Sequence, residues 1–290
     1  MKRKLAVSSM LLFAIFTLTG MSQAQEFRLK LSGGYGTMTT GDYNAFGEGL
    51  DSLIGILEAL GATTEGEFNK INLGFEYEAE LIFSLPAGFG VGVGVGYIRR
   101  GKMTEMNASL PLAGSASALI DPKITAIPVN LSAYYFTPGV VPVKFFVYGG
   151  IGYYFGKMTI DIREDSTPPA FWSEQEAMLK DQGFGLHGGV GLEFKVAPRI
   201  ALFIEGRARS CKLKGWDGNG NYEDSDGITD IDTGSLWYLE ELDQNYGSGE
   251  WLPGITLSRN IPVGSDIRNV RKFELNLSGV SLRTGIRIKF

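Results

Sequence analysis

Apolar and polar residues alternate along most of this chain, and the alternation is most regular in FGVGVGVGYIRRG at residues 89–101. Every second position there is a glycine, with bulky apolar residues between; the glycines are Gly90, Gly92, Gly94 and Gly96. Alternate residues of a strand point to opposite faces, so the pattern predicts a strand with one bulky face and one face without side chains. A nucleotide-binding GxGxxG loop would have to lead into a helix, whereas this alternation continues past Gly96.

The same period of two recurs in seven other segments, which gives eight expected strands. The seven lie at residues 26–36, 71–83, 125–136, 143–160, 184–196, 200–210 and 277–290. Long and short connections alternate between them. The long ones are residues 37–68, 104–121, 161–181 and 214–272, and the short ones lie near residues 85–88, 137–142 and 197–199. Short turns on one side, long loops on the other and an even strand number are typical of outer-membrane barrels.

The direction of the apolar face separates a membrane barrel from a water-soluble one. A soluble barrel turns its apolar face inward and its polar face to water. The polar face of these segments carries few charges and many glycines, which does not suit a solvated exterior. Closing the sheet would also satisfy the backbone hydrogen-bonding groups in lipid. We therefore expect an all-β fold, an eight-stranded antiparallel up-and-down transmembrane β-barrel with long extracellular loops.

The chain begins with three basic residues and an apolar run at residues 5–19, followed by Ser22-Gln23-Ala24. This is typical of a cleaved secretory signal peptide. We expect a signal peptide at residues 1–24, an outer-membrane barrel domain at residues 25–290, and location in the bacterial outer membrane. Without the leader, 24 basic and 32 acidic residues give a formal charge of −8, which argues against a nucleic-acid partner. The single cysteine excludes an intramolecular disulfide.

If the apolar face meets lipid, the polar face lines the interior of the barrel. It would place five acidic residues, six basic residues and one histidine there: Arg28, Lys30, Glu76, Glu78, Glu80, His187, Glu193, Glu205, Arg207, Arg209, Arg283 and Arg287. The interior of an eight-stranded barrel is only wide enough for side chains, and buried charges need partners. We prefer a closed, salt-bridged lumen to a gated narrow conduit, and we expect the glycine face to make room for long neighbouring side chains.

His187 is the one histidine of the chain. Catalysis through it would need a nucleophile and an orienting acid beside the ring, and no serine-containing nucleophile motif accompanies it. We expect a hydrogen-bonded lumen residue, no catalytic residues, no cofactor and a protein that is not an enzyme.

Two long loops carry patterns of their own. In residues 37–68, apolar residues at helical spacing predict an amphipathic helix; they are Phe46, Leu50, Leu53, Ile54, Leu57 and Leu60. We expect it to pack on loops of its own barrel, although the stripe could also line the mouth or lie on the membrane surface. In the acidic loop at residues 214–272, Asp217, Asn219 and Asn221 offer oxygen ligands at alternate positions, but Tyr222 stands where an EF-hand loop needs glycine. We prefer a solvated acidic loop to a calcium site.

The chain resembles the small outer-membrane β-barrel family that includes OmpA-type, OmpX-type and OmpW-type barrels. The leader, the eight alternating segments, IPVNLSAYYF followed by a turn and FFVYGGIGYYFGK, and the final LRTGIRIKF carry the resemblance. It implies that the barrel assembly machinery reads Phe290, Ile288 and Ile286, and that outer-membrane lipid and lipopolysaccharide surround the protein. The last long loop is longer than these barrels usually carry.

Two functions stay open. The first is a porin-like, narrow passive route that transports small or hydrophobic compounds, as an OmpW-type barrel would, with a small hydrophobic ligand as partner. The second is a structural or surface-interaction barrel with a closed lumen, whose loops bind partners. The first predicts an opening lined by apolar residues next to the loop helix. The second predicts continuous hydrogen bonding across a blocked lumen.

Overall fold

The computed structural model describes residues 26–111, 114–137, 143–244 and 247–290, so the expected signal peptide lies outside the described residues. The described chain is built from strands with one α-helix, α2 (Asp42–Ala59), and a short 3-10 helix, η1 (Pro86–Gly88). No helix in these ranges is long and apolar enough to cross a membrane. The strands are β1 (Glu26–Thr37), β2 (Thr63–Glu65), β3 (Leu73–Ser84), β4 (Phe89–Arg100), β5 (Thr104–Leu110), β6 (Gly114–Phe136), β7 (Val143–Thr167), β8 (Phe171–Ala197), β9 (Ile200–Leu213), β10 (Asp217–Asp224), β11 (Thr229–Leu242), β12 (Trp251–Ser258), β13 (Ile267–Lys272), β14 (Leu275–Asn276) and β15 (Gly279–Lys289).

These strands form one 15-stranded sheet with antiparallel pairings. A path of pairings runs from β1 through β3, β4, β6, β7, β8, β9 and β15 and returns to β1. We call these strands the ring. The remaining strands are β2, β5, β10, β11, β12, β13 and β14. The expected count of eight is therefore wrong for the sheet as a whole, because segments expected to be loops also pair as strands.

The two faces of the ring strands differ in burial as the alternation predicts. In β4, Val91, Val93 and Val95 are exposed and the glycines between them are buried. In β3, Glu76 and Glu78 are buried, while Phe75, Tyr77 and Leu81 are exposed. The outward face is thus apolar and the inward face polar, which is the reverse of a water-soluble barrel.

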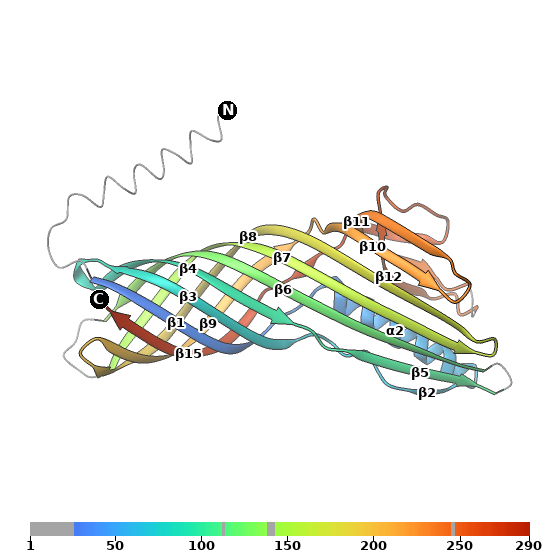
Figure 1. Cartoon of the computed structure of the whole chain (residues 1–290), viewed down its shortest axis with the longest axis horizontal. Helices are drawn as coiled ribbons and strands as arrows, with labels where there is room; N and C mark the ends of the chain where they lie inside the picture. Colours follow the sequence, from blue (N-terminus) through green and yellow to red (C-terminus); the bar gives the residue numbers. More distant parts are fainter. Residues whose placement is uncertain (1–25, 112–113, 138–142, 245–246) are drawn as a thin grey trace, which may run out of the picture.

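The two ends of the ring are built differently (Figure 1). The start of β1, the end of β15, η1 and the turn after β8 lie at one end, and α2 with β10, β11 and β12 lies at the other. We call them the turn end and the extension end. The backbone N–H of Phe290 donates to the carbonyl oxygen of Phe27 at 2.9 Å. The Phe290 side chain is exposed at the turn end, and Ile286 and Ile288 are partly buried.

Three segments expected to be long loops continue the sheet instead. The strands β6, β7 and β8 have 23, 25 and 27 residues, and β7 and β8 pair as far as Ser166 and Phe171. Residues 104–110 form β5 and residues 114–121 begin β6. Residues 161–167 and 171–181 form the tips of β7 and β8, and the segment expected at residues 214–272 contains β10 to β13. The expectation of open loops is wrong here, because backbone N–H and C=O groups find partners in neighbouring strands.

The helix expected in residues 37–68 is α2, and it packs on these added strands. Phe46, Leu50 and Ile54 contact a buried apolar cluster, which we call the extension core. Leu53 and Leu57 are partly buried, and Leu60 lies just past the helix and is exposed. The extension core consists of Met38, Tyr43, Phe68, Ile71, Ile98, Met106, Ile120, Ile124, Ala126, Tyr154, Met158, Ile160, Leu179, Cys211, Leu213, Trp216, Leu236, Phe273, Leu275 and Leu277. The apolar stripe therefore packs on the protein's own chain.

Ion pairs fix the start of α2 and the end of β9 to the segment before β15. Arg271 donates two hydrogen bonds to Asp42, one of them from Nη2 to Oδ1 at 2.6 Å. Lys212 and Lys214 lie 2.8 and 2.6 Å from the carboxylate oxygens of Glu274. Burial works to raise the pKa of Glu274, but the two lysines hold it below its ordinary value. Its contribution to stability is present above the ordinary pKa of glutamate and is lost as the pH falls through the lowered one.

Gly47 in α2 has no room for a side chain, because an added Cβ would lie 1.9 Å from Cδ1 of Phe68. We expect Gly47→Ala to destabilise the extension core by about 1–3 kcal/mol, the usual cost of overpacking. Gly55→Ala is the matched control, since a Cβ there meets nothing within 4 Å and favours the helix by about 0.5–1 kcal/mol. The rate of proteolytic cleavage within α2 measures both effects. Equal rates in the two variants would contradict this packing.

Candidate functional site

Glu78 of β3 is the central carboxylate of the lumen. Its Oε2 accepts hydrogen bonds from Arg207 Nη1 at 2.5 Å and from Asn130 Nδ2 at 2.7 Å. Its Oε1 accepts one from Arg283 Nη2 at 3.2 Å and lies 3.9 Å from Lys30 Nζ. The partners come from β9, β6, β15 and β1. One buried carboxylate therefore links five strands of the ring.

Lys30 connects this centre to two further carboxylates. Its Nζ is fully buried and lies 2.9 Å from Glu205 Oε2 and 3.4 Å from Glu80 Oε2. It also donates to the hydroxyl of Tyr134 at 3.2 Å, and that hydroxyl donates to Glu80. Arg283 Nε donates to Glu205 at 2.7 Å. Buried charges persist only with such partners, so this part of the lumen is a paired network.

A second group of charges surrounds Glu76, nearer the extension end. Its Oε1 accepts hydrogen bonds from Arg209 Nη1 and Arg100 Nη2, both at 2.9 Å. Arg100 is buried and also donates to the carbonyl oxygens of Phe75 and Gly36. The sequence reasoning missed Arg100, although the alternation of β4 turns it inward. With Arg100 included, basic residues outnumber acidic residues in the lumen by seven to five.

His187 lies in the lumen, where its Nε2 is 3.0 Å from Oγ of Ser132. The sequence offered no nucleophile beside this histidine, and the structure brings one from β6, two strands away in the ring. A triad also needs an acid at the other ring nitrogen to orient the imidazole. Within the described ranges, Nδ1 of His187 has no hydrogen-bond partner. The pair therefore lacks the third member of a catalytic triad.

Aromatic rings fill the lumen between the charges and the turn end. Phe136, Phe146 and Phe203 are buried there. The guanidinium carbon of Arg287 lies 4.9, 4.7 and 5.3 Å from their ring centroids, and Arg287 pairs with Glu193. Arg28 lies over Phe136 at 5.0 Å. Cations over ring faces are attracted by the ring quadrupole, so this aromatic cluster is tied to the charges around it.

The glycine face of β4 leaves space for the network. A Cβ on Gly92 would lie 2.4 Å from Glu80 Oε1 and 3.0 Å from the Tyr134 ring. A Cβ on Gly96 would lie 2.9 Å from Pro128 Cγ. The strand therefore carries glycines where its neighbours' side chains cross the lumen.

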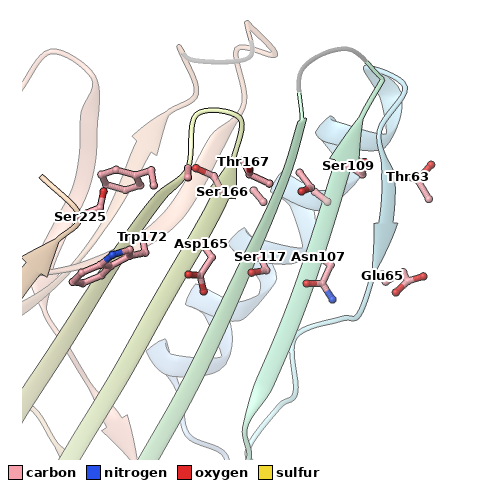
Figure 2. Close-up of a pocket in the computed structure, with 15 residues that line it drawn as sticks. Thr63, Glu65, Asn107, Ser109, Ser117, Asp165, Ser166, Thr167, Trp172 and Ser225 are labelled. Atoms are coloured by element: carbon pink, nitrogen blue, oxygen red, sulfur yellow. The ribbon is translucent and has the colours of Figure 1, made fainter.

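A separate hollow of about 820 Å³ lies at the tips of the extension strands (Figure 2). We call it the tip groove. Side chains in register across β2, β5, β6, β7 and β8 form one row, which consists of Glu65, Asn107, Ser117, Asp165 and Trp172. A second row consists of Thr63, Ser109, Ser115 and Thr167. Arg163 Nε donates to Asp165 at 3.0 Å. The groove thus combines an indole with several hydroxyl groups, one amide and two carboxylates.

The calcium pattern lies on β10, where Asp217, Asn219 and Asn221 are exposed on one face of the strand. Alternate residues of a strand are about 6.5–7 Å apart, which is too far for three side chains to close around one ion as a loop does at about 2.3–2.6 Å. Among the described residues, no group of three or more His, Cys, Asp and Glu could hold a metal ion. The expectation of a loop at these positions is wrong, since they pair with β8 and β11.

Comparison with protein families decides the class of the protein. The family model described as outer membrane protein beta-barrel domain matches residues 8–230. The chain belongs to this outer-membrane barrel family. As a member of the family, the protein is located in the outer membrane, which agrees with the apolar outward face of its ring.

Solved structures of outer-membrane barrels are similar to this family member at low sequence identity. Neisserial surface protein A shares 13% identity with a TM-score of 0.40, over 92% of this chain and 100% of that chain. A major outer membrane protein from Thermus thermophilus shares 12% with a TM-score of 0.41, over 92% and 100%. The outer membrane protein OprG from Pseudomonas aeruginosa shares 9% with a TM-score of 0.41, over 92% and 97%. No curated protein matches the chain.

Proposed function

We propose that the protein is a non-enzymatic, structural and surface-interaction barrel with a closed lumen. In this proposal the eight ring strands span the outer membrane after a signal peptide is cleaved, with the turn end in the periplasm and the extension outside the cell. Lipid surrounds the outward apolar residues, and Phe290 with Ile288 and Ile286 guides assembly. The observation that carries the proposal is the continuous network around Glu78, which joins five strands across the lumen.

The filling of the ring favours a closed barrel over a passive route. A route for small or hydrophobic compounds would need an opening beside α2. The space on that side is occupied by the extension core, with Trp216 and Tyr43 buried in it. Toward the turn end, the stacked rings of Tyr134 and Tyr148, with centroids 5.0 Å apart, lie next to Phe146 and Phe203. Apolar packing above and below the charges leaves a lumen filled by side chains.

The proposal that the protein is not an enzyme rests on its histidine. Ser132 and His187 are paired, but the imidazole Nδ1 has no acid to orient it among the described residues. Both side chains are buried within the network of the ring. A substrate would have to displace that network to reach them.

We expect the refolded protein to show no discrete single-channel conductance in planar bilayers, because paired side chains fill its lumen. A general outer-membrane porin in the same bilayers is the positive control. Discrete conductance in the wild type that changes in Arg207→Ala would contradict the closed lumen and would favour the passive route.

For the tip groove we propose a neutral saccharide chain, such as the sugars of lipopolysaccharide, as the partner. An indole offers an apolar face to a sugar ring, and the hydroxyl and amide groups in register offer hydrogen bonds. The lining carries Glu65 and Asp165 and no basic residue, which disfavours anionic chains.

We expect Trp172→Ala to lower binding of the protein to neutral glycans on an array by about tenfold, the loss expected when about 1.4 kcal/mol of contact is removed. Trp251→Ala is the matched control, since Trp251 lies on β12 outside the groove and contacts Arg268. Equal loss in both variants, or no glycan binding by the wild type, would contradict this assignment.

A further inference from the structure

The mouth of the ring at the turn end is a hollow of about 330 Å³ lined by charged side chains. They are Glu26, Arg28, Lys144, Glu193, Lys195, Arg199, Arg287 and Lys289. Six of them are basic and two acidic. The hollow is lined by the beginnings of β1, β7 and β9 and the ends of β8 and β15. Phe136, Phe146 and Phe203 lie between this hollow and the network around Glu78. Arg287 of the hollow lies over all three rings, and Lys30 of the network lies 5.4 Å from the ring centroid of Phe203.

The two carboxylates of the mouth do not neutralise its bases. Glu26 pairs with Arg28 and Lys289, and Glu193 pairs with Arg287. In the part of the chain that the structure describes, Lys144, Lys195 and Arg199 form no ion pair. Deeper in the lumen each basic side chain has a carboxylate within ion-pair distance, whereas these three at the mouth have none. An excess of positive charge in a concave site attracts anions.

Arg287 shows where an anion would be held. Arg287 is 2% exposed, and of its guanidinium nitrogens only Nη1 donates a hydrogen bond, to Glu193. Nε and Nη2 are buried and have no hydrogen-bond partner in the described structure, and neither has Nε of Arg28. The Nε and Nη2 edge of a guanidinium is the fork that binds two oxygens of a carboxylate or phosphate at once. Leaving such buried donors unpaired costs about 1–3 kcal/mol each, and more for charged groups.

We propose that the mouth at the turn end is a binding site for a phosphate group, held by the free edge of Arg287 and by Arg28, with Lys144, Lys195 and Arg199 around it. The phosphate belongs either to a small soluble phosphate or to a lipid headgroup. The dianion of a free phosphate or phosphomonoester suits a cluster with four more basic than acidic residues better than a single carboxylate does, while a lipid phosphodiester offers one charge and two free oxygens to the guanidinium edge. The volume admits a phosphate or a small phosphomonoester, and the aromatic cluster limits how deep it can enter.

Inorganic phosphate is the first probe, titrated calorimetrically into the refolded full chain in an uncharged detergent at constant ionic strength. We expect saturable binding that weakens more than tenfold in Arg287→Gln. Because Arg287→Gln could disturb folding, Lys195→Gln combined with Arg199→Gln is the second variant. Both residues are exposed at the turn, and we expect a several-fold loss of affinity. Lys102→Gln, an exposed lysine at the extension end, is the control and should bind like the wild type.

Native mass spectrometry of the same proteins after incubation with phosphatidylglycerol tests the lipid source. Retained lipid that is lost in the Lys195→Gln and Arg199→Gln variant, with no response to inorganic phosphate, would assign the site to a headgroup. Binding of inorganic phosphate without retained lipid would assign it to a soluble phosphate. Absence of both, or equal binding in the turn variant and the Lys102→Gln control, would overturn the proposal.

Discussion

Glu78→Ala is expected to lower the free energy of unfolding by about 3–5 kcal/mol, the usual cost of removing one partner from a buried ion-pair network. The carboxylate accepts hydrogen bonds from Arg207, Asn130 and Arg283, and it lies near Lys30. Its removal leaves these donors buried without their acceptor while the aromatic packing around them persists. Equilibrium unfolding by urea in phospholipid vesicles, followed by circular dichroism of the strands, measures the loss.

Two further variants separate the effect of losing a negative charge from the effect of its buried position at Glu78. Glu78→Gln keeps the volume and should fall between the wild type and Glu78→Ala, because one amide oxygen can still accept hydrogen bonds. Glu174→Ala removes an acid that pairs with Arg163 at 3.0 Å, where both side chains are more than half exposed. Exposed pairs contribute about 0–1 kcal/mol. If Glu78→Ala costs no more than Glu174→Ala, the network is not what holds the ring together.

Trp216→Ala should destabilise the extension core by about 3–5 kcal/mol, the range for truncating a large buried aromatic residue. Trp216 is 1% exposed, and it joins residues from α2, the ring and the added strands in one cluster. The four tryptophans, Trp172, Trp216, Trp237 and Trp251, all lie at the extension end. Tryptophan fluorescence during unfolding therefore follows this core, while circular dichroism follows mainly the ring.

The matched control for this variant is Trp251→Ala. Trp251 is partly exposed on β12 and has Arg268 over its ring at 4.3 Å, so its loss should cost less. We expect the fluorescence transition of Trp216→Ala to move to lower urea while the transition of the ring stays in place. A joint shift of both transitions would show that the ring and the extension core unfold as one unit.

The ring could be predicted from the sequence because one face of its strands is apolar and turned outward while the other is inside, which imposes a period of two. The extension could not be predicted in this way. Its strands carry charges on both faces, as in the DIREDST tip of β7 at residues 161–167, and so they lack the alternation by which a half-buried strand is found. Two of their pairings also join segments that are about 40 residues or more apart, since β10 pairs with β8 and β2 with β5.

The candidate site, too, could be predicted only in part. The inward positions of Lys30, Glu78 and Glu205 follow from alternation. The ion pairs that these side chains form depend on the register of the strands and on the position of each strand in the ring, which alternation does not give. Ser132 and His187 come together although they are 55 residues apart. The tip groove and the mouth at the turn end are built from single residues of many strands, so no contiguous motif marks either of them.

The length of the strands at the extension end has a consequence for where the protein acts. A bilayer takes about 9–11 residues of a tilted strand, and β8 has 27 residues. The exposed apolar residues of β8 begin at Phe184, so at about 3.3 Å per residue and a tilt near 45° the 13 residues before it reach roughly 30 Å beyond the hydrocarbon core. With the extension outside the cell, as proposed, the groove would stand beyond the lipid headgroups, within reach of large molecules outside the cell.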